Sequence, residues 1–223
     1  MVYSTLVLAA VLSVLYFQQT SAVTYCNTVN IPSVTKCYQT YMASFNVRMR
    51  DKIPEYWVFR NARSALFKKN GQYEESLNCQ FTNTLLNCLD SNFECMGQYT
   101  YTALGASNST EAIDYWTDLL INQYQCTTEG YQLKMDNFSC YENCRKDHSS
   151  EIDSCHSDLA RNIKSGMELC LALQTNVNCN SDIQRKCCGY NASVLACNTE
   201  VAGSRASTPV CSQRGNVSCP VAN

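Results

Sequence analysis

The sequence predicts an all-α protein, a disulfide-stapled helical bundle with a loose C-terminal tail tethered by cysteines. Apolar residues recur at steps of three and four along several segments, whereas strand-like alternation is weak throughout. Only four prolines and eight glycines occur among 223 residues, which is too few for the turns of a hairpin-rich β protein. Sixteen cysteines provide the material for the staples.

Three helices are expected in the first part of the chain. One follows Pro54, a residue that suits a first helical turn, and carries apolar positions at Tyr56, Phe59, Ala62 and Leu66. A second follows Gly71, with apolar positions at Leu77, Phe81, Leu85 and Cys88. The third starts at Asn108-Ser109-Thr110-Glu111, a good helix entry, and continues through Trp116, Leu120 and Tyr124.

The later part of the chain is expected to contain one long helix and two short ones. The long helix covers residues 150–175 and places Cys155 and Cys170 on one apolar face, about four turns apart. These two cysteines must therefore find different partners. Short helices are expected over residues 181–188 and 192–202.

The first segment has the composition of a secretion signal. Leu6 to Phe17 is a 12-residue apolar run, shorter than the roughly 20 residues that cross a bilayer. Small residues at positions 20–22 fit a signal-peptidase site, although no Lys or Arg precedes the run. We expect residues 1–22 to be a signal peptide and the protein to be secreted and extracellular, with no membrane span.

The mature chain is expected to form one disulfide-rich helical domain over residues 23–203. Residues 204–223 form a Ser/Pro/Gly-rich tail that Cys211 and Cys219 tether. If the chain has two lobes instead, the Gly/Thr/Ser-rich stretch at 96–108 is the expected join. A chain of this length buries around 70% of its unfolded surface, so it does not need disulfides to form a core. The disulfides are expected to make the folded protein more durable.

All sixteen cysteines are expected to form disulfide bonds, because the secretory pathway oxidises such thiols. Their connectivity cannot be read from the sequence. The residues are Cys26, Cys37, Cys79, Cys88, Cys95, Cys126, Cys140, Cys144, Cys155, Cys170, Cys179, Cys187, Cys188, Cys197, Cys211 and Cys219.

Two close cysteine pairs allow an expectation about their partners. Cys140 and Cys144 are four residues apart, so on a helix they face the same way and are expected to join one neighbouring helix. Cys187 and Cys188 are adjacent and diverge on any regular backbone, so we expect them to join two different elements.

Metal binding is the alternative role for some of these cysteines. Cys140, Cys144, Cys155 and His156 could form a tetrahedral zinc set, but their spacing is loose and the compartment is oxidising. We predict neither a metal site nor another cofactor.

A catalytic site is not predicted. The two histidines, His148 and His156, lie in a polar, acidic stretch and are expected on the surface. A hydrolase built on His156 with Ser154 or Ser157 would need an orienting carboxylate and an oxyanion hole, and no Gly-rich segment there provides one. We therefore predict that the protein is not an enzyme.

The order of the cysteines carries a resemblance. Cys26 and Cys37 precede a long gap and the triple Cys79-x8-Cys88-x6-Cys95. Cys126 is then followed by Cys140, and the series ends in Cys170, Cys179, Cys187-Cys188 and Cys197. This order resembles the secreted cysteine-rich domain of unknown function best known from nematode proteins, although Cys144 and the two tail cysteines depart from it. The resemblance implies secretion and a stapled helical fold, and it carries no established activity or functional residues.

Four N-x-[ST] sequons are present, at Asn108, Asn137, Asn191 and Asn216. Chance alone produces several such matches in a chain rich in asparagine, but exposed sequons in secreted proteins are commonly used. We expect N-glycosylation. Asn137 is the most doubtful site, because early disulfide formation at the nearby Cys140 could block access.

The aromatic residues have two interpretations. Trp57 and Trp116 are expected to pack in the helical core, with polar tips at its edge. The exception is the segment 55–67, which is aromatic, basic and free of cysteine. In that segment Tyr56 and Trp57 could form a partner-binding surface.

The function that fits best is a secreted, disulfide-rich, N-glycosylated and non-enzymatic protein. We expect a structural or binding component of an extracellular fluid or matrix, such as an egg coat, cuticle or shell matrix. Its partners would be other extracellular matrix or receptor proteins. The net charge of −2, with interleaved signs, gives no basic stripe for nucleic acid. The alternatives are a secreted effector, such as a venom component or pheromone-like ligand, and a secreted hydrolase.

Overall fold

The computed structural model describes residues 26–213 and 215–219. The predicted signal peptide lies outside these residues. Within them the chain forms ten α-helices and one 3₁₀-helix, with no strand. The predicted all-α fold class is therefore confirmed. None of the helices in the described ranges is both long and apolar enough to cross a bilayer.

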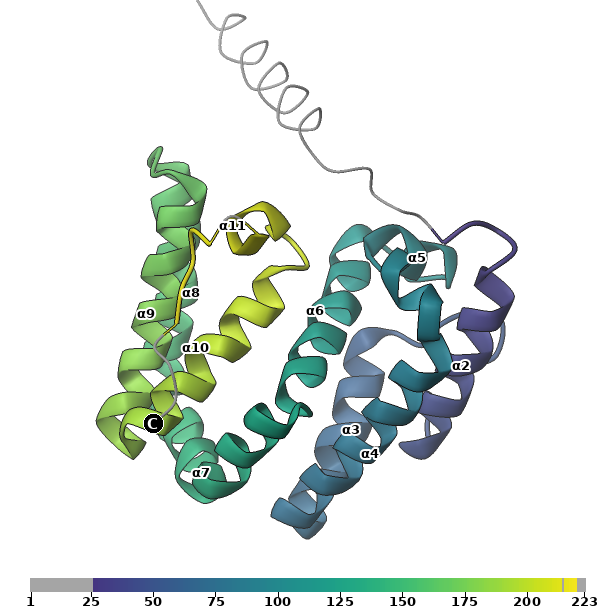
Figure 1. Cartoon of the computed structure of the whole chain (residues 1–223), viewed down its shortest axis with the longest axis horizontal. Helices are drawn as coiled ribbons and strands as arrows, with labels where there is room; N and C mark the ends of the chain where they lie inside the picture. The colour runs from purple at the N-terminus through teal and green to yellow at the C-terminus, as the bar shows by residue number, and fades with distance from the viewer. Residues whose placement is uncertain (1–25, 214, 220–223) are drawn as a thin grey trace, which may run out of the picture.

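The helices fall into two groups along the chain (Figure 1). The first half, residues 26–126, contains α2 (Ile31–Ser44), α3 (Tyr56–Asn70), α4 (Gln72–Leu89), η1 (Asp90–Cys95), α5 (Gln98–Ala103) and α6 (Ser109–Gln125). The second half, residues 127–219, contains α7 (Thr128–Asp147), α8 (Ser149–Lys164), α9 (Leu169–Cys188), α10 (Tyr190–Ser204) and α11 (Pro209–Gln213).

The three helices predicted in the first half are present. α3 begins two residues after Pro54, and α4 begins directly after Gly71. α6 is capped by Asn108, whose side-chain oxygen accepts a hydrogen bond from the Glu111 amide at 2.9 Å. Because this bond satisfies an amide that has no partner within the helix, it fixes where α6 starts.

An aromatic cluster forms the core of the first half. Tyr38, Phe59 and Tyr101 are fully buried. Tyr38 and Tyr101 meet edge to face with their ring centroids 5.5 Å apart, and their hydroxyl groups hydrogen-bond to each other. Trp116 packs partly buried against this core, beside Phe93. The core prediction for Trp116 is thus confirmed.

α10 is the central helix of the second half. It packs against α9, α7 and α6, and residues from Ala192 to Cys197 are buried almost without interruption. A helix that is buried on all sides needs small side chains where its neighbours approach. At Gly203 an added Cβ would lie 3.1 Å from Ile121 of α6, so a larger residue here would require the isoleucine side chain to shift by a few tenths of an ångström.

The long helix predicted over residues 150–175 is wrong, because the chain breaks into α8 and α9. Gly166 lies in the break with φ +92°, a left-handed conformation that glycine adopts readily. The apolar periodicity continues through the break, which is why it indicated one helix. α9 then runs to Cys188, so the short helix predicted over 181–188 is its last part. The helix predicted over 192–202 corresponds to α10.

All sixteen cysteines are paired, as predicted. The eight bonds are Cys26–Cys95, Cys37–Cys88, Cys79–Cys126, Cys140–Cys188, Cys144–Cys187, Cys155–Cys179, Cys170–Cys211 and Cys197–Cys219.

The expectation for Cys140 and Cys144 is confirmed, since both join α9. The expectation that Cys187 and Cys188 join different elements is wrong, since both join α7. Adjacent helical residues point about 100° apart, and these two straddle the line along which α7 and α9 meet. Cys140 and Cys144, one turn apart, each meet one of them.

The C-terminal tail is tethered by Cys211 and Cys219, as predicted. It also contains α11 and buries Cys211 and Val217, which are 0% and 6% exposed, against α9 and α10. The tail is therefore packed onto the second half more closely than its Ser/Pro/Gly composition suggests.

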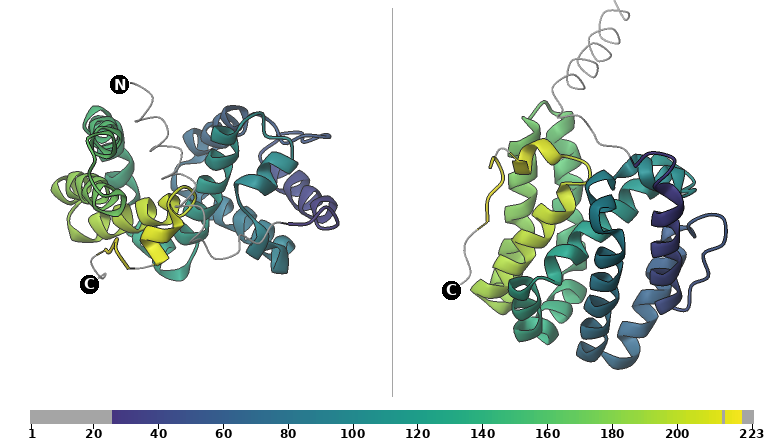
Figure 2. Two further views of the ribbon diagram at one scale, coloured as in Figure 1. Left: turned by 90° about the horizontal axis from the view of Figure 1, so that it is seen from above. Right: turned by 45° about the vertical axis from the view of Figure 1, so that its right-hand side comes forward.

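Among the described residues, no disulfide bond joins the two halves. Three bonds lie within residues 26–126 and five within residues 140–219. The boundary between the two disulfide networks thus falls after Cys126, not in the 96–108 stretch considered above. The halves meet mainly where α6 lies against α10, as the right-hand view of Figure 2 shows.

A buried polar network fills part of this contact, and we call it the seam. Lys134 of α7 lies 2.7 Å from the Glu75 carboxylate of α4 and donates to Gln125 Oε1 of α6 at 2.9 Å. Gln125 Nε2 in turn donates to Thr199 of α10 at 3.2 Å. The Lys134 and Glu75 side chains are only 10% and 4% exposed, so each charge depends on the other for compensation.

Cleavage of one peptide bond tests the disulfide map. With a protease site inserted between Cys126 and Thr127, cutting is expected to give two fragments that separate on a denaturing, non-reducing gel. A site inserted beside Gly71 is the control, because Cys26–Cys95 and Cys37–Cys88 span it and keep the fragments joined until they are reduced. Fragments that stay joined after the 126–127 cut would contradict the map.

Replacing Lys134 with methionine tests the seam. The change leaves the Glu75 charge buried without its partner, which typically costs about 3–5 kcal/mol. We expect this loss in the free energy of unfolding, measured by denaturant titration of the disulfide-intact protein. The control is Arg161→Met, which removes an exposed pair with Asp158 and is expected to cost less than about 1 kcal/mol. Equal losses in the two variants would contradict a buried ion pair.

Candidate functional site

The structure places Tyr56 and Trp57, the two residues of the predicted partner surface, in different environments. Trp57 lies in the first turn of α3 with 61% of its surface exposed, so the expectation that it packs in the core is wrong. Tyr56 is half-buried and donates its hydroxyl hydrogen bond to Asp118 of α6 at 3.2 Å. The indole is therefore available for contact, while the tyrosine holds the start of α3.

Further polar contacts fix the position of Trp57. Its indole N–H donates to the Glu55 carboxylate, and the Tyr56 amide donates to Glu111 at 2.8 Å. Although partial burial opposes it, hydrogen bonds from Ser107 and Tyr56 lower the pKa of Glu111. Arg60 lies one turn along the helix and is exposed. We call Glu55, Trp57 and Arg60 the Trp57 surface.

α3 carries no cysteine, and its position depends on packing and on an ion pair. Phe59 is fully buried, and Arg63 forms a two-pronged ion pair with Asp118, in which Nη1 lies 2.7 Å from Oδ2. Burial opposes the charge on Arg63, but the Asp118 carboxylate raises the pKa of Arg63 above its ordinary value. α3 thus has a fixed position without a covalent staple.

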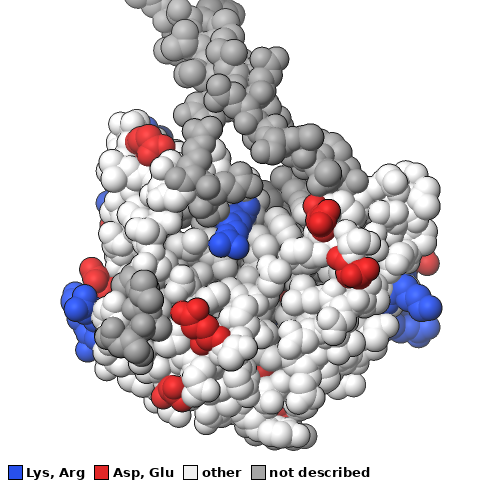
Figure 3. Space-filling model, viewed as in Figure 1, with Lys and Arg blue, Asp and Glu red and all other residues white. Residues whose placement is uncertain are grey.

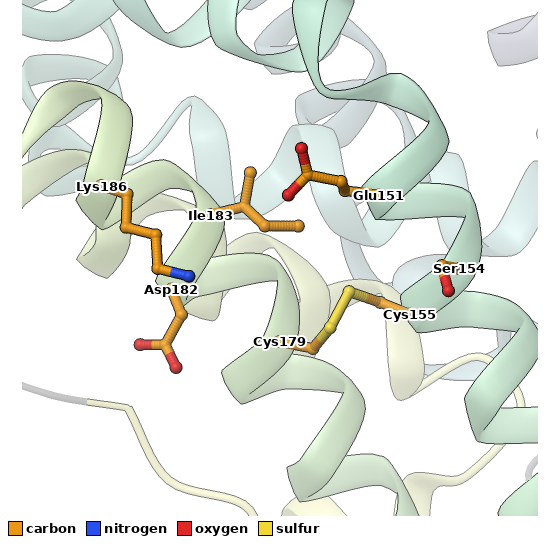
Figure 4. Close-up of a pocket in the computed structure, with 7 residues that line it drawn as sticks. All are labelled: Glu151, Ser154, Cys155, Cys179, Asp182, Ile183 and Lys186. Carbon is orange, nitrogen blue, oxygen red and sulfur yellow. A yellow bond between two sulfur atoms is a disulfide. The ribbon is translucent and has the colours of Figure 1, made fainter.

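A second candidate region is an open depression between α8 and α9 (Figure 4). Its volume is about 310 Å³. Glu151 of α8 and Ile183 of α9 point into the space between the helices, and the Cys155–Cys179 disulfide spans it. A neighbouring depression of about 190 Å³ shares Glu151, Ile183 and Lys186 with it and adds His148 and Cys187.

His148 lies beside a disulfide bond in the smaller depression. A ring nitrogen of His148 and the sulfurs of Cys144 and Cys187 lie within 4.8 Å of one another. His148 Nδ1 also lies 2.6 Å from Glu151 Oε1. Such a group could hold a metal ion if the sulfurs were thiolates, but here the two sulfurs are bonded to each other. The zinc set considered above is not assembled either, because Cys140, Cys144 and Cys155 belong to three different disulfides.

His156 has an acidic partner from another helix. The Glu200 carboxylate of α10, 3.8 Å from His156 Nε2, raises the pKa of His156. Ser157, which a hydrolase interpretation would pair with it, donates its hydroxyl to the Asp153 carbonyl at 2.9 Å. His156 therefore takes part in a surface ion pair that the sequence did not indicate.

The four sequons differ in exposure. Asn108 and Asn216 are exposed, at the start of α6 and in the segment after α11. Asn137 is half-buried in α7 and donates its side-chain amide to the Leu133 carbonyl at 2.8 Å. Asn191 is half-buried in the first turn of α10, with its side-chain oxygen enclosed.

Sequence reasoning missed the depression altogether. No sequence motif includes Glu151, Ile183 or Lys186. Because the sequence predicted one continuous helix here, it did not indicate that α8 and α9 face each other. Gly166 was the available signal for that hairpin. The charged side chains in Figure 3 are likewise scattered over the visible face, with no stripe of one sign to mark a site.

No family model, curated protein or solved structure matches the chain.

Proposed function

We propose that the protein is a secreted, N-glycosylated and non-enzymatic component of an extracellular matrix, and that it binds a matrix protein through the Trp57 surface. The observation that carries the proposal is the exposure of Trp57 on α3, a long helix without a cysteine. Tryptophan and arginine are the residues most enriched among those that dominate protein–protein binding energy.

The contacts of Trp57 support a binding role. An exposed indole that is held by Glu55, on a helix fixed by Arg63 and Asp118, loses little conformational freedom when a partner covers it. Preorganisation of this kind increases affinity because less entropy is lost on association. The surface is also mixed in character, with an apolar ring between Glu55 and Arg60, which suits a protein partner.

The disulfides support service in an extracellular setting. Proteins that keep many disulfides are those of oxidising compartments, and each bond typically adds about 2–4 kcal/mol. A chain of this length has enough core to fold without eight of them. We infer that the excess gives durability, which a matrix component needs.

Glycosylation is expected at Asn108 and Asn216 and not at Asn137 or Asn191. A glycan bonds to the side-chain nitrogen. At Asn108 this nitrogen donates to the Ser107 hydroxyl on the exposed surface, and the oxygen that caps α6 stays in place. The Asn137 nitrogen instead donates to the Leu133 carbonyl in a half-buried position of α7. Peptide mass spectrometry of the secreted protein, with and without enzymatic deglycosylation, measures occupancy. Occupied Asn137 or Asn191, with bare Asn108 and Asn216, would contradict this expectation.

Replacing Trp57 with alanine tests the binding surface. The probe is decellularised matrix from the source tissue, washed with high salt and detergent before the secreted protein is added. Loss of a dominant aromatic contact is worth at least about 2 kcal/mol, or roughly 30-fold in affinity. We expect that loss for Trp57→Ala, at unchanged secretion.

The matched control is Tyr73→Ala, because Tyr73 is 66% exposed and lies at the other end of the α3–α4 pair. It should bind matrix as well as the unchanged protein. If the unchanged protein is not retained on matrix, the matrix proposal is wrong and a soluble effector becomes the better interpretation. If both variants bind equally, the matrix contact lies elsewhere on the protein.

A further inference from the structure

The Cys144–Cys187 disulfide has surroundings that suit reaction with a thiol. We propose that it is a thiol–disulfide exchange site, at which a small thiol of the glutathione class becomes bonded to Cys187. The inference does not depend on the proposed function. It rests on the depression beside Cys187, the position of His148 and the difference in exposure between the two sulfurs.

The two cysteines differ in access. Cys144 is 4% exposed, whereas Cys187 is exposed and lines the 190 Å³ depression. Exchange requires a thiolate to reach one sulfur while the other leaves. The incoming thiol is therefore directed to Cys187, and Cys144 becomes the leaving group.

The reaction is balanced without an oxidant or a reductant beyond the thiol itself. The thiolate attacks Cys187 Sγ and forms a new sulfur–sulfur bond, while the Cys144–Cys187 bond breaks. Its electron pair passes to Cys144 Sγ, which leaves as a thiolate and can take up a proton. The products are a mixed disulfide at Cys187 and a free thiol at Cys144, which can attack Cys187 again and restore the starting state.

His148 is placed to assist the departure of Cys144. Its ring nitrogen lies within 4.8 Å of both sulfurs, and its Nδ1 is 2.6 Å from the Glu151 carboxylate. An imidazolium beside a cysteine sulfur stabilises that sulfur as a thiolate. A thiol that is more stable as its thiolate leaves faster in exchange.

Lys186 and Glu151 set the character of the incoming thiol. Both line the depression at Cys187, and Asp182 lines the neighbouring depression of about 310 Å³. Lys186 can pair with a carboxylate of the incoming thiol and Asp182 with its amino group, and a thiol of the glutathione class carries both kinds of group. The small size of the depression favours a small molecule over a protein thiol.

The neighbouring bond makes the exchange compatible with the folded state. Cys140–Cys188 joins the same two helices one turn away. When Cys144–Cys187 opens, α7 and α9 stay covalently linked, so the opened state keeps its helix packing.

The test is the order in which the bonds react. The native protein is incubated with a limiting amount of reduced glutathione, quenched by alkylation at intervals and mapped by mass spectrometry. We expect glutathione on Cys187 and the alkyl group on Cys144 before any other cysteine is modified. Cys170–Cys211, whose sulfurs are both buried, is expected to be among the last.

Three variants separate the role of His148 from simple exposure. His148→Gln is expected to slow the first step roughly tenfold by removing the stabilisation of the leaving thiolate, and His148→Lys to recover much of the rate. His156→Gln is the matched control and should react at the original rate, because that ring pairs with Glu200.

Two results would overturn the proposal. One is first modification at another bond, above all at Cys140–Cys188, where Cys140 is also exposed. The other is an unchanged rate in His148→Gln. The order of modification in the unaltered protein decides the first point even if a His148 variant is not secreted.

Discussion

The buried ammonium group of Lys134, held between Glu75 and Gln125, is the interaction on which the arrangement of the two halves depends. Each half has its own disulfide network, and no bond crosses between them within the described residues. Packing of α6 on α10, with Ile121 close to Gly203, also brings the halves together. A buried charge tolerates only the alignment in which it meets its partners, so the seam selects a single docking geometry.

The distribution of the staples separates rigid parts from parts that rely on packing. α9 holds four cysteines, and α7 and α4 hold two each, whereas α3 holds none. α3 is positioned by Phe59 in the aromatic core and by the ion pair of Arg63 with Asp118. It is also the helix that presents an exposed tryptophan. Its interactions thus fix the proposed binding surface without enclosing it in the covalent network.

The two disulfide bonds between α7 and α9 combine durability with a reactive position. Two disulfides one turn apart secure the same contact, so the loss of one does not separate the helices. The bond beside His148 can therefore respond to thiols while the other keeps the structure. A durable matrix protein and a local exchange site are compatible for this reason, and neither proposal requires the other.

The sequence by itself determined the helical class, the starts of α4 at Gly71 and α6 at Asn108, and the oxidised state of every cysteine. Periodicity and capping are local properties, and oxidation follows from the cysteine count expected of a secreted chain. The helices α2, α5, α7 and α11 were not predicted. The buried face of α7 includes only a few apolar residues, such as Leu133 and Tyr141. Disulfide pairing, the exposure of Trp57 and the meeting of His148 with Cys187 were decided only by the tertiary structure. Each depends on which helix faces which, and the distances between residues far apart in the chain are set by packing rather than by local pattern.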